Sequence, residues 1–176
     1  MRILHYIFLT LTIIWLAVIF IFSSQTGDTS SNTSGAIVDI IVSIFIPDFL
    51  EYSPTEQQDI SDTVSFIVRK GAHFAEYAIL GLLSFLTAMT YIWKKMLSSS
   101  VDELHRVFWL KCLKCGIVSL IFACTYAITD EFHQGFVADR SPALRDVCID
   151  SCGAFVGIIF ACFCLSIYFK KKKSRT

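Results

Sequence analysis

Four long apolar runs constrain the fold of this chain more than any other feature. Each holds about 20 mostly hydrophobic residues, the length an α-helix needs to cross the hydrocarbon core of a bilayer. Hydrophobic residues make up 55% of the 176 residues, more than in ordinary soluble domains. The sequence therefore predicts an all-α, polytopic membrane protein with four transmembrane helices, over residues 3–22, 67–93, 107–133 and 147–169.

The length suits one domain, predicted over residues 1–169 and followed by a basic cytoplasmic tail over 170–176. The first run is interpreted as an uncleaved anchor rather than a signal peptide, because bulky Phe20, Ile21 and Phe22, not small residues, precede Ser23.

The basic residues are distributed unevenly between the two sides of such a bundle. Eleven of the 15 Lys and Arg residues fall near the termini or between the second and third spans, and the other four are Arg69, Lys70, Arg140 and Arg145. Because cytoplasmic loops carry the excess of Lys and Arg, both termini are predicted to be cytoplasmic.

The connection between the first two spans has an apolar middle, Gly35 to Leu50. This stretch of 16 residues is too short to span the bilayer comfortably. It predicts an amphipathic helix that lies in the membrane interface or folds over a site as a lid. An equally weighted alternative is a hydrophobic plug packed against the bundle.

Ionisable residues, together with the polar Gln134, gather at three ends of these runs. If the spans alternate in direction, all three clusters meet at the outer face of the membrane. Ionisable groups within membrane spans are costly and usually functional. The clusters are Arg69, Lys70, His73 and Glu76; Asp130, Glu131, His133 and Gln134; and Asp146 and Asp150.

Helical spacing groups these side chains further. Arg69, His73 and Glu76 share one face, with Tyr77 beside it. A buried carboxylate at Glu76 needs a cationic partner or becomes protonated. The alternative is an interhelical salt-bridge network that only holds the bundle together.

The cluster at the end of the third span shares a helix face only if that span stays helical through Gln134. In that case Asp130, His133 and Gln134 lie together and Glu131 points elsewhere. The alternative is a polar cap that ends the helix.

On the last helix, Asp146 and Asp150 suit a helix N-terminus, where the macrodipole favours acids. Gly153 and Gly157 continue the same face as a small-xxx-small pair, which lets another helix approach closely. Arg140 lies in the short loop before this helix, where it contacts either a ligand or solvent.

Charge and cysteine content narrow the function classes. The formal net charge is zero, which gives no case for a nucleic-acid partner. The seven cysteines lack the paired spacing of a zinc ribbon and are interpreted as buried small hydrophobic residues.

These segments together resemble the VanZ-like family, small bacterial membrane proteins named after a teicoplanin-resistance protein. The similarity runs from Ser23-Ser24-Gln25 to Gly157, and in Phe136-Val137-Ala138-Asp139 the chain departs from the Pro-Gly that members often have before Arg140. The resemblance implies a multi-pass protein of the bacterial cell membrane, associated with reduced lipoglycopeptide (teicoplanin) susceptibility and with no settled reaction. The matching segments are Arg69 to Tyr77, Thr129 to Gln134, Arg140, and Asp146 to Asp150 with Gly153 and Gly157.

Binding or remodelling of an anionic lipid or a lipid-linked cell-envelope intermediate is the favoured function, since arginine suits bidentate phosphate contacts. No cofactor is expected, and the oligomeric state is left open. The predicted ligand-binding residues are Arg69, Lys70, Tyr77, Glu131, Gln134, Arg140, Asp146 and Asp150.

The alternative is a membrane-embedded hydrolase or transferase that uses acid–base chemistry on a lipid-linked substrate. Its catalytic residues would be His73, Glu76, Asp130 and His133. A divalent metal is a lesser variant and no metal ligand is predicted, because Arg69, Lys70 and Arg140 would compensate the acids. Transport ranks lower still.

Overall fold

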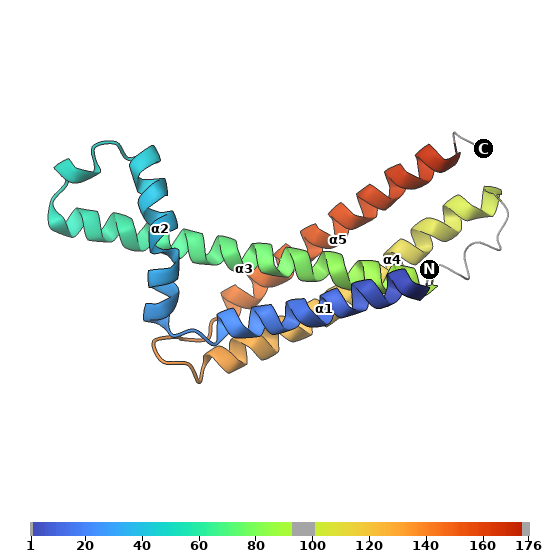
Figure 1. Ribbon diagram of the computed structural model, residues 1–176, viewed down its shortest axis with the longest axis horizontal. Coiled ribbons are helices and arrows are strands. Elements are labelled where there is room, and N and C mark those ends of the chain that lie inside the picture. The colour runs from blue at the N-terminus through green and yellow to red at the C-terminus, as the bar shows by residue number, and fades with distance from the viewer. Residues whose placement is uncertain (1, 93–100, 174–176) are drawn as a thin grey trace.

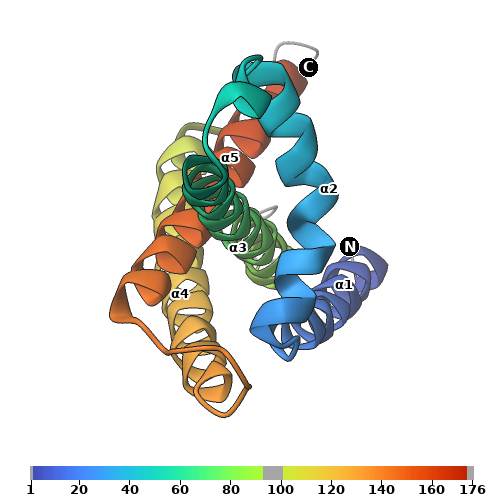
Figure 2. The same cartoon turned by 90° about the vertical axis from the view of Figure 1, so that its left-hand side faces the viewer.

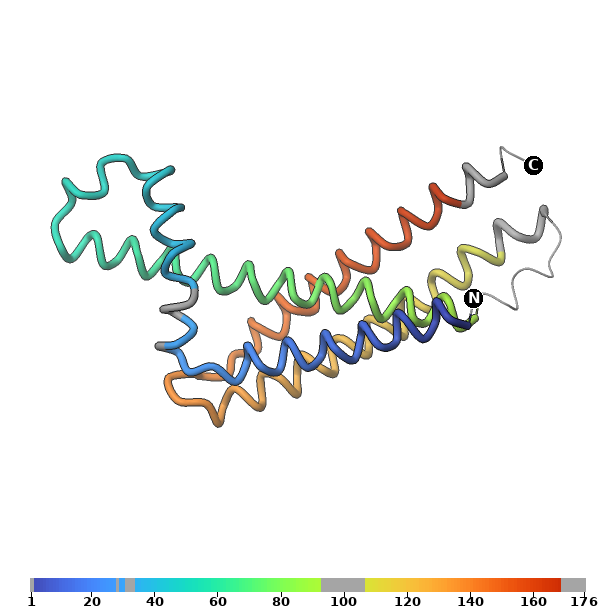
Figure 3. The backbone as a smooth tube through the Cα atoms, viewed as in Figure 1, coloured from blue at the N-terminus to red at the C-terminus, as the bar shows by residue number. Residues whose placement is uncertain are grey.

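The computed structural model describes residues 2–92 and 101–173, with side chains at these positions except 28, 31–33, 101–106 and 169–173 (Figure 3). Lys94 and Lys95, which entered the orientation prediction, lie outside the described residues. So do Trp93, the predicted end of the second span, and residues 174–176 of the predicted basic tail.

The described chain is helical throughout its regular structure (Figure 1). In this part of the chain four helices, α1, α3, α4 and α5, are long and apolar enough to cross a membrane. The predicted all-α architecture with four transmembrane helices is therefore confirmed. The elements are α1 (Arg2–Ser23), α2 (Gly27–Phe45), η1 (Phe49–Glu51), α3 (Pro54–Ile92), α4 (Val101–Gln134) and α5 (Leu144–Lys173).

Helix α3 begins at Pro54, well before the predicted start near residue 67. A capping box explains the early start: the Ser53 backbone N–H donates to Glu56 Oε2 (2.9 Å), and the Glu56 N–H donates to Ser53 Oγ (3.4 Å). Pro54 suits the first helical position, where no backbone donor is needed. The 39 residues of α3 extend for about 58 Å, about twice the hydrocarbon thickness. Its first part therefore lies beyond the membrane core.

Helix α3 is the centre of the bundle and packs on α1, α4 and α5 (Figure 2). One apolar cluster lies between α3, α4 and α5 and includes Phe85, Met89, Phe108 and Ile158. A second cluster joins α1 to the other three spans and includes Ile19, Tyr77, Leu80 and Ala154. This second cluster is the apolar layer that lies next to the charged ends of the helices.

The contact between α3 and α5 is the most extensive in the bundle and is made by glycine. A Cβ atom at Gly153 would overlap the backbone of Phe74, and one at Gly157 would overlap the backbone of Ala78. From the other side, a Cβ at Gly81 would overlap the backbone of Ala154. The close approach expected from the Gly153 and Gly157 spacing is present, and α3 is the partner helix.

Helix α2 crosses the end of the bundle instead of running along it (Figures 1 and 2). It starts after Thr26, whose side-chain oxygen accepts the Thr29 N–H, and it packs on α3. Its side chains form three faces: Val38 and Val42 are buried, Asp39 and Ser43 are exposed and polar, and a third exposed face is apolar. The apolar face holds Ile37, Ile40 and Ile44.

The expectation of uniformly buried cysteines is wrong in part. Cys112 and Cys115 are buried in the apolar cluster between α3, α4 and α5, but Cys148, Cys152 and Cys164 are exposed on α5. These three cysteines therefore lie on the surface of the bundle and not in its core.

Candidate functional site

The three charged clusters lie at one end of the bundle, the end where α1 turns into α2 and a loop joins α4 to α5 (Figure 1). The N-terminus and the end of α5 lie at the opposite end. The structure thus brings together side chains that are separated by up to about 80 residues of sequence.

His73 from α3, Asp130 from α4 and Asp150 from α5 form the centre of this site. One donor atom from each lies within 4.8 Å of the others, and His73 Nδ1 is 4.0 Å from Asp150 Oδ1. Asp130 is 4% exposed and Asp150 is 1% exposed. The Oδ1 atom of each aspartate has no hydrogen-bond partner among the described residues. We call these three residues the central triad.

Lys70 and Asp146 form an ion pair at the rim of the site. Lys70 Nζ donates to Asp146 Oδ2 over 2.5 Å, and both side chains are less than a quarter exposed. Arg145 approaches the same carboxylate more loosely, with Nε 3.8 Å from Oδ1. The ring of Phe66 lies beneath the Lys70 and Arg145 charges. Lys70 therefore forms its ion pair with Asp146, and its charge acts on His73 of the central triad only at longer range.

Arg140 reaches the site from the loop between α4 and α5. Its NH1 group donates to Gln134 Oε1 (3.3 Å), and Gln134 Nε2 donates to Ser23 Oγ (2.9 Å) and Asp130 Oδ2 (3.3 Å). The Arg140 Nε atom is buried without a partner among the described residues. Burial lowers the pKa of Arg140 below its ordinary value, and the nearby Arg69 adds to this effect. The guanidinium still carries its charge at neutral pH.

Glu131 has a local structural contact. Its Oε1 atom accepts the backbone N–H of Ala143 over 2.6 Å, just before α5 begins. The side chain is buried, and it holds the α4–α5 loop against the end of α4. This contact occupies one of the carboxylate oxygens that were predicted to bind a ligand.

His133 faces α1 rather than the central triad. Its Nε2 atom is 3.1 Å from Ser24 Oγ, and its ring stacks on Phe20 with centroids 4.7 Å apart. With Asp130 it lines a cavity of about 150 Å³ between α1 and α4, whose other lining residues are Phe20, Tyr126 and Thr129. Through this cavity, Asp130 can also be reached from the side of the bundle.

Glu76 and Tyr77 lie next to the triad on α3. Glu76 interacts electrostatically with Asp130 and Arg140, and its backbone carbonyl accepts Trp15 Nε1 over 2.8 Å. Tyr77 is fully buried, and its hydroxyl lies near Asp130 without a hydrogen bond of normal length. Both residues belong to the polar cluster that the sequence analysis assembled.

The end of α1 and the residue after it contribute polar groups that the sequence pattern placed in the family similarity but not among the site residues. Ser23 is 1% exposed and accepts a hydrogen bond from Gln134, and Ser24 contacts His133. The sequence signal for these contacts was the Ser23-Ser24 pair at the end of an apolar run. Such a pair is also expected where a helix simply ends, so it did not indicate a site.

The start of α2 supports the loop that carries Arg140. The Gly27 N–H donates to the Ala138 carbonyl over 3.3 Å, and a Cβ at Gly27 would overlap the Asp139 carbonyl oxygen. Asp139 has φ 59°, a left-handed conformation that glycine adopts freely and that aspartate tolerates. This is the part of the loop in which the chain departs from the Pro-Gly of the VanZ-like pattern.

A family model described as VanZ/LLP1 matches residues 8–165. The match covers most of the chain, so the chain belongs to this family, and the resemblance seen in the sequence is confirmed. No curated protein and no solved structure matches the chain.

Proposed function

We propose that this member of the VanZ/LLP1 family binds a phosphate-bearing anionic lipid or lipid-linked envelope intermediate at the outer leaflet of the bacterial cell membrane. The observation that carries the proposal is Arg140. Its guanidinium is partly buried at the polar end of a membrane bundle, where NH1 donates to the Gln134 amide oxygen and Nε has no hydrogen-bond partner among the described residues. Guanidinium groups suit the paired oxygens of a phosphate.

Arg69 supports the same interpretation, because it lies close enough to affect both Arg140 and His73 electrostatically. Two nearby guanidinium groups repel each other. An anionic headgroup between them relieves that repulsion and takes up the hydrogen-bond donors that face it.

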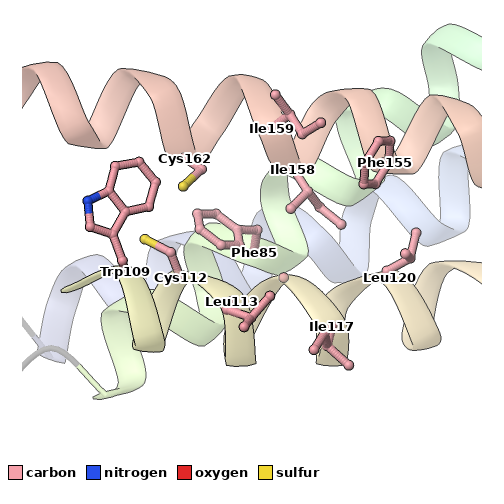
Figure 4. Close-up of a pocket in the computed structure, with 11 residues that line it drawn as sticks. Phe85, Trp109, Cys112, Leu113, Ile117, Leu120, Phe155, Ile158, Ile159 and Cys162 are labelled. Carbon is pink, nitrogen blue, oxygen red and sulfur yellow. The ribbon is translucent and has the colours of Figure 1, made fainter. Parts of the chain in front are cut away.

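Two apolar surfaces fit the lipid tails of such a ligand. The exposed face of α2, with Ile37, Ile40 and Ile44, suits a helix lying in the membrane interface beside the site. An apolar groove of about 280 Å³ lies between α4 and α5 (Figure 4). Trp109 and Cys162 lie toward one end of the groove and Leu120 and Phe155 toward the other, so an acyl chain can lie along the bundle.

The test is the lipid that co-purifies with the full chain in mild detergent. Arg140→Ala is expected to lower retained phospholipid or isoprenyl phosphate by about tenfold, the loss of one charge-assisted contact. Arg140→Lys is expected to retain an intermediate amount, since the charge stays and the bidentate geometry is lost. Lys114→Ala removes an exposed cation of α4 that lies 20 residues before Gln134, away from the site, and serves as the matched control.

Equal retention of anionic lipid by wild type and Arg140→Ala contradicts the proposal. An effect on drug susceptibility follows if the bound lipid is used in the envelope. Deleting the protein should then change susceptibility to lipid-tailed glycopeptides more than to glycopeptides without a tail, measured as minimal inhibitory concentrations.

Lipid-directed catalysis is the second candidate, favoured by the convergence of His73 with two aspartates. Turnover of a phospholipid in proteoliposomes, lost in His73→Ala and Asp130→Asn, would support it.

A further inference from the structure

We propose that the central triad, His73, Asp130 and Asp150, binds a divalent metal ion with mixed nitrogen and oxygen preference, such as Zn²⁺. The three residues come from three different helices, α3, α4 and α5. Their donor atoms nevertheless converge to within 4.8 Å of one another. An imidazole nitrogen and two carboxylate oxygens are ligands that Zn²⁺ accepts in proteins.

One buried oxygen of each aspartate in the triad lacks the partner that a buried charge requires. Asp130 and Asp150 are 4% and 1% exposed, and each has an Oδ1 atom without a hydrogen bond among the described residues. The Tyr77 hydroxyl, also unpartnered, lies beside them. Two carboxylates buried side by side repel each other unless a cation or a shared proton neutralises them.

The basic side chains expected to compensate these acids are directed elsewhere. Lys70 Nζ pairs with Asp146 at 2.5 Å, and Arg140 NH1 donates to the Gln134 amide oxygen. Among the described residues, His73 is the only side chain able to carry a positive charge that forms an ion pair with Asp150, at 4.0 Å. Lys70 and Arg140 act on the triad only at longer range, and in the described part of the chain neither forms an ion pair with Asp130 or Asp150. A metal ion would supply the direct cationic contact.

The donor atoms must move closer together to hold an ion. Donors placed about 2.0–2.2 Å from a tetrahedral Zn²⁺ ion lie about 3.3–3.6 Å from one another. The donor atoms of the triad lie up to 4.8 Å apart, so the widest pair must close by up to about 1.5 Å, a distance that side-chain rotations cover. Three protein ligands leave at least one coordination position open, as in zinc sites that bind an exchangeable ligand.

The open coordination position connects the metal site to the proposed lipid ligand. A phosphate oxygen of the headgroup can complete the coordination while Arg140 holds the other phosphate oxygens. That second step rests on the proposed function, whereas the metal site itself does not.

A proton shared between Asp130 and Asp150 is the competing explanation for the unpartnered oxygens. The two explanations differ in what they predict. If the site holds only a shared proton, Zn²⁺ does not displace it, and the protonated carboxyl group stays visible by its infrared C=O stretch. A metal site gives stoichiometric metal and loses that stretch when the ion binds.

The test is metal content of the full chain, purified in mild detergent through a tag without histidine. After exposure to Zn²⁺ and desalting, mass spectrometry of the elements should find about one Zn²⁺ per chain. Asp130→Asn and Asp150→Asn should each weaken Zn²⁺ binding by at least about tenfold in a competition titration with a chelating dye. Asp39→Asn and His5→Gln change the same residue types away from the triad and should keep the full metal content.

A second measurement uses the unaltered chain and so does not depend on how the variants fold. Removing metal with a chelator should lower the thermal unfolding temperature, and adding Zn²⁺ should restore it. Wild-type protein that retains no Zn²⁺, or aspartate variants that bind it as tightly as wild type, would overturn the proposal. A protonated-carboxyl stretch that persists after Zn²⁺ is added would also overturn it.

Lipid retention measured on the same samples separates the two proposals. If Asp150→Asn loses metal and keeps its lipid, the metal site stands and the phosphate ligand on the metal is wrong. If Arg140→Ala keeps its lipid and its metal, the metal site stands and the proposed function fails.

Discussion

At the scale of single residues, the ion pair between Lys70 and Asp146 shows how burial changes the contribution of an ion pair to stability. Their side chains are 24% and 14% exposed, whereas Arg145, which touches the same carboxylate at 3.8 Å, is 65% exposed. Solvent-exposed ion pairs contribute little to stability. Removing one partner of a buried pair costs much more, because the remaining charge is left without compensation.

We expect Lys70→Met to lower the free energy of unfolding by about 1–2 kcal/mol, and Arg145→Met to change it by less than about 0.5 kcal/mol. The measurement is an unfolding titration with denaturing detergent in mixed micelles. The double variant Lys70→Met/Asp146→Asn should recover part of the loss, because it no longer leaves a charge unpaired. Equal losses for Lys70→Met and Arg145→Met would show that the short pair is not a stabilising contact.

Some residue roles were accessible from spacing and others were not. Helical spacing placed His73 and Glu76 on one face of α3, and both do lie in the polar cluster. The expected common face of Asp130, His133 and Gln134 is divided in the structure: Gln134 bonds Asp130, but His133 turns to Ser24 on α1. Spacing along one helix gives the direction of a side chain, and the neighbouring helix decides which partner it meets.

At the scale of helices, the glycine contact between α3 and α5 determines whether the charged clusters can meet. Gly153 lies three residues after Asp150, and Gly157 lies one turn further. Because both glycines rest on the α3 backbone, the start of α5 is held where Asp150 faces His73. A wider spacing of these helices would separate the triad.

We expect Gly157→Ala to lower the free energy of unfolding by about 1–3 kcal/mol, because the added Cβ overlaps the Ala78 carbonyl and forces the helices apart. Gly71→Ala is the matched control, because a methyl group added at this position of α3 would meet no atom within 4 Å. There the substitution should be neutral or stabilise by up to about 1 kcal/mol through helix propensity.

The same detergent titration measures both variants, and metal binding reports whether the triad is displaced. If Gly157→Ala and Gly71→Ala behave alike, the α3–α5 contact is looser than the structure has it.

At the scale of the whole molecule, the four spans place the two ends of the bundle at opposite membrane surfaces. The site, α2 and the first part of α3 share one end, and the N-terminus lies at the other (Figure 1). The excess of Lys and Arg near the termini predicts that this end faces the cytoplasm. On this prediction, the candidate site faces the outside of the cell.

We expect a protease-cleavable tag inserted between Pro47 and Asp48, in the segment between α2 and α3, to be cut by protease added to intact cells. The same tag placed after Thr176 should be cut only after the membrane is opened. Immunoblotting for the fragments gives the result. Cleavage of the C-terminal tag in intact cells would reverse the orientation and place the site in the cytoplasm.

Local properties of the sequence determined the number of spans, the helical class and the family, because apolar length and short motifs do not depend on distant contacts. The early start of α3 was also encoded locally, in the capping box Ser53-Pro54-Thr55-Glu56. The prediction missed this start because it followed the apolar run, which begins only near residue 67. Only the tertiary structure decided which charges pair. It joined Lys70 to Asp146 and left Asp130 and Asp150 with unpartnered oxygens around His73. That choice depends on how three helices pack, since a side chain has a partner only where another helix brings one within a few ångströms.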